Sequence, residues 1–253
     1  MAQGAVARYL GLLRGAPAPG LIEAMLAKCA WALLGSAIST LLVPGPVPAR
    51  EDQPKCRGDT ATIVAENPDD LVFGTPRDDV IVVTEGRAEV IARSGRDRIC
   101  TSSSRDVVYG GSGADFIDAG AGNDEIEGDA GRDMLKGGAG KDDLRGGPQA
   151  DSLRGGIDDD DLNGDDGRDV LAGQRGDDRA NGGAEIDSVF GNTGDDDMTG
   201  NGGDDLVHGG DGDDLLAGER GNDRLDGGNG VDECDGGTMR DHAMRCETVD
   251  SVP

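Results

Sequence analysis

A nine-residue unit recurs without insertion or deletion from Gly110 to Met244, and it constrains the fold of this chain more than any other feature. The first copies read Gly-Gly-Ser-Gly-Ala-Asp-Phe-Ile-Asp, Ala-Gly-Ala-Gly-Asn-Asp-Glu-Ile-Glu and Gly-Asp-Ala-Gly-Arg-Asp-Met-Leu-Lys. A short fixed period is the signature of repeat proteins, in which every unit packs mainly against its neighbours. The sequence therefore predicts a stack of similar units.

Four positions of the unit carry the pattern. Position 6 is Asp in all fifteen units, from Asp115 to Asp241, and position 8 is apolar or small throughout. Position 1 is Gly in fourteen units, with Ala119 as the exception. Position 4 is Gly in eleven units, and the exceptions are Gln149, Asp158, Glu185 and Met239. Random placement of a common residue would not repeat one phase fifteen times.

The last three positions of each unit predict a short strand. Glu125, Ile126 and Glu127 place one aliphatic side chain inside, between two acids that point outward. Positions 1 to 6 are interpreted as turn residues, because their glycines supply left-handed dihedrals at little steric cost. Two units then form an eighteen-residue coil, and Asp115 is expected to stack near Asp133 at roughly the 4.8 Å spacing of parallel strands.

The same phase extends backwards from Gly110 to Cys56. Six units keep an apolar eighth position, and four of them keep the Asp. An unrelated domain is the alternative for this region, and the unbroken register argues against it. The residues concerned are Ile63, Val72, Ile81, Val90, Ile99 and Val108 at position 8, and Asp70, Asp79, Asp97 and Asp106 at position 6.

The unit matches the pattern G-G-x-G-x-D-x-U-x, in which U is a large apolar residue, and the chain thus resembles the RTX, or hemolysin-type, calcium-binding nonapeptide repeat family. The match is strong from Gly110 to Asp235 and partial from Cys56 to Tyr109. The resemblance implies an all-β fold, a right-handed parallel β-roll (β-solenoid). It also implies that the Asp of position 6 and the carbonyl groups of the turns bind each calcium ion.

The chemistry of the stacked carboxylates favours the same metal. Carboxylates at strand spacing repel one another, and a hard cation between turns removes that penalty. Ca²⁺ accepts six to eight oxygen ligands in flexible geometry, whereas Mg²⁺ demands a tighter octahedron. Zn²⁺ prefers Cys or His, and the two histidines, His208 and His242, are interpreted as surface residues. The candidate metal ligands are Asp115, Asp124, Asp133, Asp142, Asp151, Asp160, Asp169, Asp178, Asp187, Asp196, Asp205, Asp214, Asp223 and Asp232.

Part of the array departs from the pattern. Left-handed dihedrals cost non-Gly residues roughly 1–2 kcal/mol, and Gln149, Asp158 and Glu185 stand where Gly is expected. Ala180 also fills less of the core than the aliphatic residues of other units. We expect poorer calcium occupancy over residues 146–190.

Composition excludes several classes of partner. The net charge is −27, which repels nucleic acid and anionic membranes and attracts cations. Aromatic residues make up 2% of the chain, so a disordered acidic chain is the alternative that composition alone permits. The order of the repeat argues against disorder.

The sequence suggests four segments. Residues 1–49 contain an apolar run from Cys29 to Val43 and then Val47-Pro48-Ala49, which indicates a secretory signal peptide whose true start is suspected at Met25. A short N-terminal anchor helix is the alternative. Residues 50–109 are expected to be degenerate repeats that form an N-terminal cap, residues 110–235 the calcium-binding repeats, and residues 236–253 a C-terminal cap and tail. The protein is therefore expected to be secreted.

Four cysteines remain after residue 49, and an even count in a secreted chain permits two disulfides. Cys234–Cys246 is favoured by proximity, and Cys56–Cys100 follows by default although the two residues lie far apart along the array. The Cys234–Cys246 loop is expected to cover the open end of the solenoid, and a disordered tail is the alternative.

Two functions fit these features. The first is a secreted calcium-binding protein that is disordered without calcium and folds on binding an array of Ca²⁺ ions. The second is an extracellular adhesion or matrix module in which calcium is only structural and the outer faces bind a cell-surface or matrix partner. An enzyme is not expected, because no metalloprotease, nucleophile-elbow or phosphate-loop motif occurs.

Overall fold

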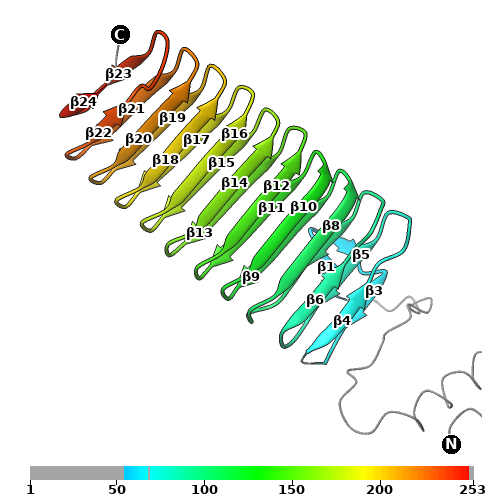
Figure 1. Ribbon diagram of the computed structural model, residues 1–253. Helices are drawn as coiled ribbons and strands as arrows, with labels where there is room; N and C mark the ends of the chain where they lie inside the picture. The colour runs from blue at the N-terminus through cyan, green and yellow to red at the C-terminus, as the bar shows by residue number, and fades with distance from the viewer. Residues whose placement is uncertain (1–53, 68, 251–253) are drawn as a thin grey trace, which may run out of the picture. The chain divides into compact units, whose positions relative to one another are not determined.

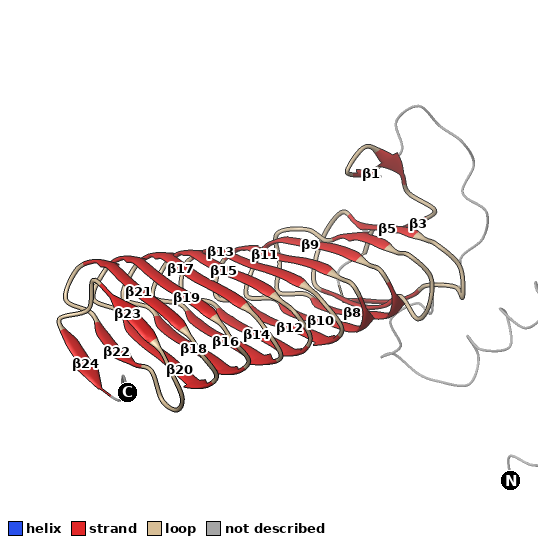
Figure 2. Cartoon of the chain, turned by 90° about the horizontal axis from the view of Figure 1, so that it is seen from above, coloured by secondary structure: helices blue, strands red, loops and turns tan. Residues whose placement is uncertain are grey.

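The computed structural model describes residues 54–67 and 69–250, which wind into a parallel β-solenoid. From residue 63 onward, successive strands alternate between two eleven-stranded sheets, so that each coil contributes one strand to each sheet (Figure 1). The strands of one sheet lie side by side along the length of the solenoid (Figure 2). Within the described residues there is no helix, so none is long and apolar enough to cross a membrane. The expected all-β fold, a β-roll of nonapeptide repeats, is confirmed.

The two sheets are named here by the parity of their strand numbers. The even sheet consists of β4 (Asp70–Phe73), β6 (Ala88–Ile91), β8 (Val107–Gly113), β10 (Glu125–Gly131), β12 (Asp143–Pro148), β14 (Asp161–Asp166), β16 (Arg179–Ala184), β18 (Asp197–Gly202), β20 (Leu215–Arg220), β22 (Glu233–Asp235) and β24 (Thr248–Asp250). The odd sheet consists of β3 (Ile63–Ala65), β5 (Val80–Val83), β7 (Arg98–Cys100), β9 (Phe116–Ala121), β11 (Met134–Ala139), β13 (Ser152–Ile157), β15 (Val170–Arg175), β17 (Ser188–Thr193), β19 (Leu206–Asp211), β21 (Arg224–Asn229) and β23 (His242–Met244).

The core is a column of position 8 side chains between the two sheets. Ile126 pairs with Leu144 in the even sheet, and Leu135 with Leu153 in the odd sheet, at the eighteen-residue offset expected from the repeat. The position 8 residues from Val72 to Cys234 are 0–1% exposed, including those of the degenerate units. Burial of each Leu or Ile contributes about 1.5–3 kcal/mol, so the column replaces the aromatic core that this chain lacks.

Strands β8 to β21 are longer than the three residues predicted from the sequence, whereas β3, β7, β22, β23 and β24 have that length. β11 runs through six residues, from position 7 of one unit to position 3 of the next. The additional residues pair in register with neighbouring coils, as Gly138 does with Gly156 and Ala139 with Ile157. After β9 and after β11 to β21, only positions 4 to 6 turn the chain. The extension is possible because coils stacked in parallel satisfy the backbone N–H and C=O groups of positions 1 to 3.

The backbone at position 4 is left-handed in most units, including those in which the sequence has no Gly there. Gln149, Asp158 and Glu185 have φ values of +83°, +74° and +82°. Position 2 carries the same strain in several units, which the sequence reasoning missed. Positive φ values there occur at Asp129, Asp165, Gln174, Asn192, Asn201 and Glu219.

At the N-terminal end of the described chain, Ile63 keeps the predicted register and pairs with Ile81, but the residues before it depart from the prediction. Instead of forming a turn, β1 (Lys55–Cys56) and β2 (Asp59–Thr60) pair as a small antiparallel hairpin. Cys56 packs in a small cluster with Phe116 and forms a disulfide with Cys100. The expected pairing is confirmed, but the expected distance between the two cysteines was wrong. Their Cα atoms are 5.6 Å apart because the hairpin folds back over strands of the odd sheet instead of extending the stack.

At the C-terminal end, residues 236–250 add β23 and β24, one further strand to each sheet. The last coil is shorter than the others, since Cys234 of β22 pairs in register with Val249 of β24. The disulfide Cys234–Cys246 lies within this coil and confirms the favoured pairing. Residues 1–49, with the expected signal peptide, lie outside the described residues.

Candidate metal centre

The aspartates of position 6 form two ladders, one at the start of the strands of each sheet. The backbone N–H of Asp115 donates to Asp133 Oδ1 at 2.8 Å, and that of Asp124 donates to Asp142 Oδ1 at 2.8 Å. The same bond joins consecutive members along each ladder. The ladder of the odd sheet contains Asp97, Asp115, Asp133, Asp151, Asp169, Asp187, Asp205, Asp223 and Asp241, and that of the even sheet contains Asp106, Asp124, Asp142, Asp160, Asp178, Asp196, Asp214 and Asp232.

One oxygen of every ladder carboxylate has no hydrogen-bond partner within the protein. Oδ1 accepts the N–H of the preceding coil, whereas the buried Oδ2 accepts nothing, in all seventeen residues of the two ladders. Asp142 and Asp160, for example, are only 3% and 4% exposed. A buried carboxylate oxygen without a partner is costly unless a proton or a cation satisfies it. The buried Oδ2 atoms, which recur at every coil of the ladders, therefore need a proton or a cation as a partner.

The glycine of position 1 makes room for this oxygen. A Cβ placed on Gly146 would lie 2.6 Å from Asp151 Oδ2, and one on Gly128 would lie 2.8 Å from Asp133 Oδ2. The same space beside Gly146 is bordered by the carbonyl oxygen of Gly164 in the next coil, at 2.9 Å from that Cβ position. Position 1 is thus Gly because its side-chain space belongs to a cradle lined by carboxylate and carbonyl oxygens.

Burial changes the acidity of the ladder carboxyl groups. It raises the pKa of Asp151 and Asp160 to about 8 and that of Asp142 to about 6. The hydrogen bond from the backbone N–H of the preceding coil works in the opposite direction, and neighbouring ladder carboxylates raise the pKa of Asp151 and Asp160 further. Each group is therefore unfavourable as a free anion, and a bound cation would relieve this.

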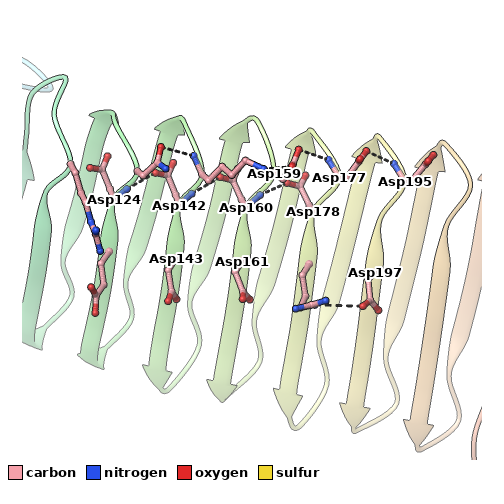
Figure 3. A pocket seen from close by; sticks show the side chains of 15 residues that line it. Asp124, Asp142, Asp143, Asp159, Asp160, Asp161, Asp177, Asp178, Asp195 and Asp197 are labelled. Carbon is pink, nitrogen blue, oxygen red and sulfur yellow. Dashed lines mark hydrogen bonds and ion pairs between the residues drawn. The ribbon is translucent and has the colours of Figure 1, made fainter.

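A second row of aspartates lies outside the ladder of the even sheet, at position 5. Asp159 Oδ1 accepts the N–H of Asp177 at 3.2 Å, and Asp177 Oδ1 accepts the N–H of Asp195 at 3.0 Å (Figure 3). These residues are exposed, and Lys141 forms an ion pair with Asp159. The outer row adds negative charge beside the ladder. Its carboxylates are held in place by hydrogen bonds from backbone N–H groups in the turn of the next coil.

All fourteen candidate ligands predicted from the sequence lie in the two ladders. The sequence reasoning did not include Asp97, Asp106 and Asp241, which have the same unpartnered oxygen. Asp97 and Asp106 were recognised as position 6 residues, but the glycines around them are missing. By contrast, both oxygens of Asp79 accept hydrogen bonds, Oδ2 from Thr75 and Oδ1 from Thr62 of the preceding coil. The ladders therefore begin after Asp79.

The oxygens available in the cradle suit calcium. Among residues 54–67 and 69–250, no three His, Cys, Asp or Glu side chains gather as a cluster that could hold a metal ion. Side chains alone thus cannot supply a zinc-type site, and backbone carbonyls must complete the coordination. A set of carboxylate and carbonyl oxygens in a flexible turn is the donor set that Ca²⁺ accepts.

Comparison with models of known protein families matches four copies of the RTX calcium-binding nonapeptide repeat, at residues 101–135, 136–171, 172–207 and 208–238. Together the copies cover more than half of the chain and most of both ladders. A search among curated proteins found no match. The chain therefore belongs to the RTX calcium-binding nonapeptide repeat family, and its repeats bind Ca²⁺.

Proposed function

We propose that this is a secreted protein whose repeat array folds when calcium ions bind along its two aspartate ladders. The observation that carries the proposal is the unpartnered, buried Oδ2 atom that recurs at every coil from Asp97 to Asp241. Without a cation these carboxylates oppose the packing of the coils, and with one they stabilise it. The proposed ligands are the fourteen predicted carboxylates, from Asp115 to Asp232, together with turn carbonyls.

Folding on binding is expected from the thermodynamic linkage between calcium binding and folding. A ligand that binds only the folded chain stabilises it by about 1.4 kcal/mol per site at ten times its dissociation constant. With many similar sites the sum is comparable to the net stability of an ordinary domain, about 5–15 kcal/mol. The core column of single aliphatic residues is narrow, so we expect the calcium-free chain to be unfolded at neutral pH.

The test is circular dichroism of the full chain, combined with calorimetric titration of calcium. We expect a β spectrum in Ca²⁺, a disordered spectrum in chelator, and restoration by added Ca²⁺ with heat that parallels the spectral change. Mg²⁺ at the same concentration is the control and should restore much less structure. A full β spectrum in chelator would contradict folding on binding, and absence of any calcium heat would contradict the function itself.

Secretion is proposed from the N-terminal apolar segment and from the two disulfides, since disulfides persist in oxidising compartments. Expression of the full chain in a bacterial host, followed by mass analysis of the culture medium and periplasm, tests this. The expected product begins at Arg50. Retention of an uncleaved chain in the cytoplasm would exclude the proposal.

A further inference from the structure

One unit of the array that begins at Gly110 has a side chain in the cradle. Position 1 faces the inside of the coil, and for each repeat unit from Gly110 to Gly227 that has Gly there, an added Cβ would lie within 2.9 Å of the Oδ2 atom of its own Asp. Ala119 is the exception, and its methyl group is fully buried. In the other units from Gly110 to Gly227 the missing side chain leaves room for Oδ2, whereas beside Asp124 a methyl group takes up this space.

Asp124 is otherwise an ordinary member of the ladder. Its Oδ1 accepts the backbone N–H of Asp106 at 2.7 Å, and its Oδ2 is buried without a partner. The residue is 2% exposed, as its neighbours are. At the cradle, this unit differs from the next one along the ladder, with Gly137 and Asp142, by the methyl group at position 1.

We infer that the methyl group of Ala119 keeps the Asp124 position free of calcium at concentrations that fill its neighbours, so that the metal array along the even sheet begins at Asp142. Calcium holds its oxygen ligands at about 2.3–2.6 Å and needs six to eight of them around it. A methyl carbon beside Oδ2 takes the place of ligand or ion and supplies no lone pair. The inference rests on the proposed function and refines it, because, of the fourteen proposed ligands, Asp124 is the one that stays free while its neighbours bind calcium.

The ladder of the odd sheet also has a side chain at position 1 near its N-terminal end. Along the ladder of the odd sheet, Ala92 occupies position 1 of the unit of Asp97, whereas Gly110 occupies that of Asp115. The first cradle with Gly at position 1 is therefore that of Asp115 on the odd-sheet ladder and that of Asp142 on the even-sheet ladder. Calcium binding therefore begins at different coils on the two ladders. The ladders themselves begin within one unit of each other, at Asp97 and Asp106.

Native mass spectrometry of the full chain tests the inference by counting bound calcium ions, at the lowest calcium concentration that brings the wild-type count to its plateau. We expect Ala119→Gly to gain one ion and Gly137→Ala to lose one. Ala217→Gly makes the same change at the outward-facing position 9 of β20 and should leave the count unchanged. Adding Asp124→Asn to Ala119→Gly should return the count to the wild-type value.

An unchanged count in Ala119→Gly, in protein that shows the wild-type β spectrum in calcium, would overturn the inference. So would an equal gain in Ala217→Gly, since the effect would then not depend on the cradle. Failure of the proposed function would give a different result: the wild-type chain itself would bind no calcium ions. If Gly137→Ala does not fold, Ala119→Gly and its double variant still decide the question.

Discussion

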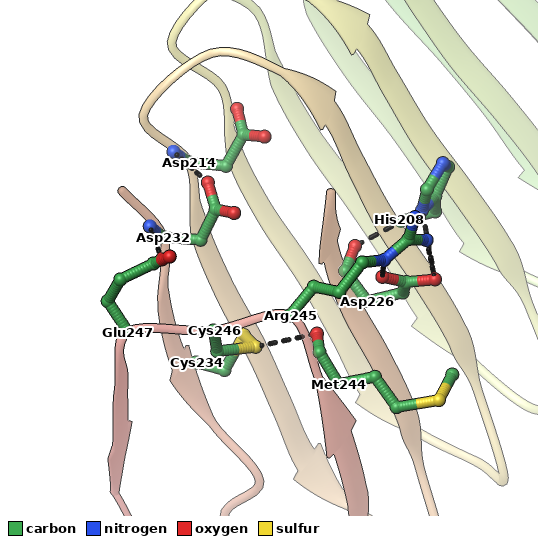
Figure 4. The surroundings of a disulfide bond; sticks show 9 residues. All are labelled: His208, Asp214, Asp226, Asp232, Cys234, Met244, Arg245, Cys246 and Glu247. Carbon is green, nitrogen blue, oxygen red and sulfur yellow. Dashed lines mark hydrogen bonds and ion pairs between the residues drawn. A yellow bond between two sulfur atoms is a disulfide. The ribbon is translucent and has the colours of Figure 1, made fainter. Parts of the chain in front are cut away.

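Glu247 ends the even-sheet ladder by taking the place of an aspartate: the backbone N–H of Asp232 donates to Glu247 Oε2 at 2.7 Å (Figure 4). Everywhere else on this ladder the acceptor is Asp Oδ1, eighteen residues further along the chain. Here the separation is fifteen residues, because the disulfide-bonded last coil is shorter. The longer side chain reaches the same N–H, so the last backbone donor of the ladder is satisfied.

Removal of this acceptor should destabilise the C-terminal coil. We expect Glu247→Ala to lower the free energy of unfolding by about 1–3 kcal/mol, because the N–H of Asp232, a residue that is 1% exposed, loses its partner. Urea unfolding in saturating calcium measures the change. Glu247→Gln retains an acceptor oxygen and should lose less than half as much. Equal losses in the two variants would show that charge, and not the hydrogen bond, matters at this position.

The calcium-free chain should be more structured in mild acid than at neutral pH. Burial raises the pKa of Asp151 to about 8, with the charges of Asp133, Asp169 and Asp165 acting in the same direction. A group whose pKa is raised on folding favours the folded state fully below its unfolded value near 4, and this contribution disappears as the pH rises through the folded value. The β signal in chelator should therefore decrease between about pH 4 and pH 8.

Circular dichroism in chelator across this range is the measurement, with the calcium-loaded protein as control. The loaded protein should change little above pH 6, because bound cations replace the protons. A calcium-free chain whose β signal increases with pH would contradict the assigned cause.

The strained turns predict uneven uptake of calcium along the array. Gln149, Asp158 and Glu185 hold left-handed dihedrals that Gly adopts at no cost, each worth about 1–2 kcal/mol. At limiting calcium, we expect faster amide hydrogen exchange in residues 146–190 than in residues 191–235. Strained position 2 residues such as Asn192 and Glu219 occur in the second region too, which narrows the expected difference.

Substitution separates this strain from other effects. Gln149→Gly should slow exchange in its region and stabilise the loaded protein by about 1 kcal/mol. Arg175→Gly is the control, because this strand residue is not left-handed and the change should destabilise by about 0.5–1 kcal/mol. Equal exchange in both regions of the wild-type protein would exclude the prediction.

The N-terminal hairpin should depend on the Cys56–Cys100 disulfide. Arg57 lies over the Phe116 ring at 4.4 Å from its centroid, and Asp59 pairs with Arg98 at 3.0 Å, but these contacts are few. We expect Cys100→Ser to lower stability by about 2–4 kcal/mol and to speed tryptic cleavage after Arg57. Limited proteolysis followed by mass analysis measures it. Cys246→Ser, at the other end, should leave cleavage after Arg57 unchanged.

Residues of the repeat allowed much of the structure to be predicted. The position 8 column, the eighteen-residue offset and the stacking of Asp115 with Asp133 follow from a strict period, because each unit meets only its neighbours. The left-handed backbone at Gln149 was predictable for the same reason. Glu247 could have been found from Glu247-Thr248-Val249-Asp250, which repeats positions 6 to 9 three residues early.

The sequence by itself determined the period, the inward aliphatic residues and the row of aspartates, since these depend on local alternation and repetition. Only the tertiary structure decided that Asp Oδ1 is used by the preceding coil while Oδ2 is left to a ligand, and that position 1 forms part of its cradle. It also brought Cys56 to Cys100. These relationships join residues of different coils or segments, where the distance depends on how the backbone folds back and not on spacing along the chain.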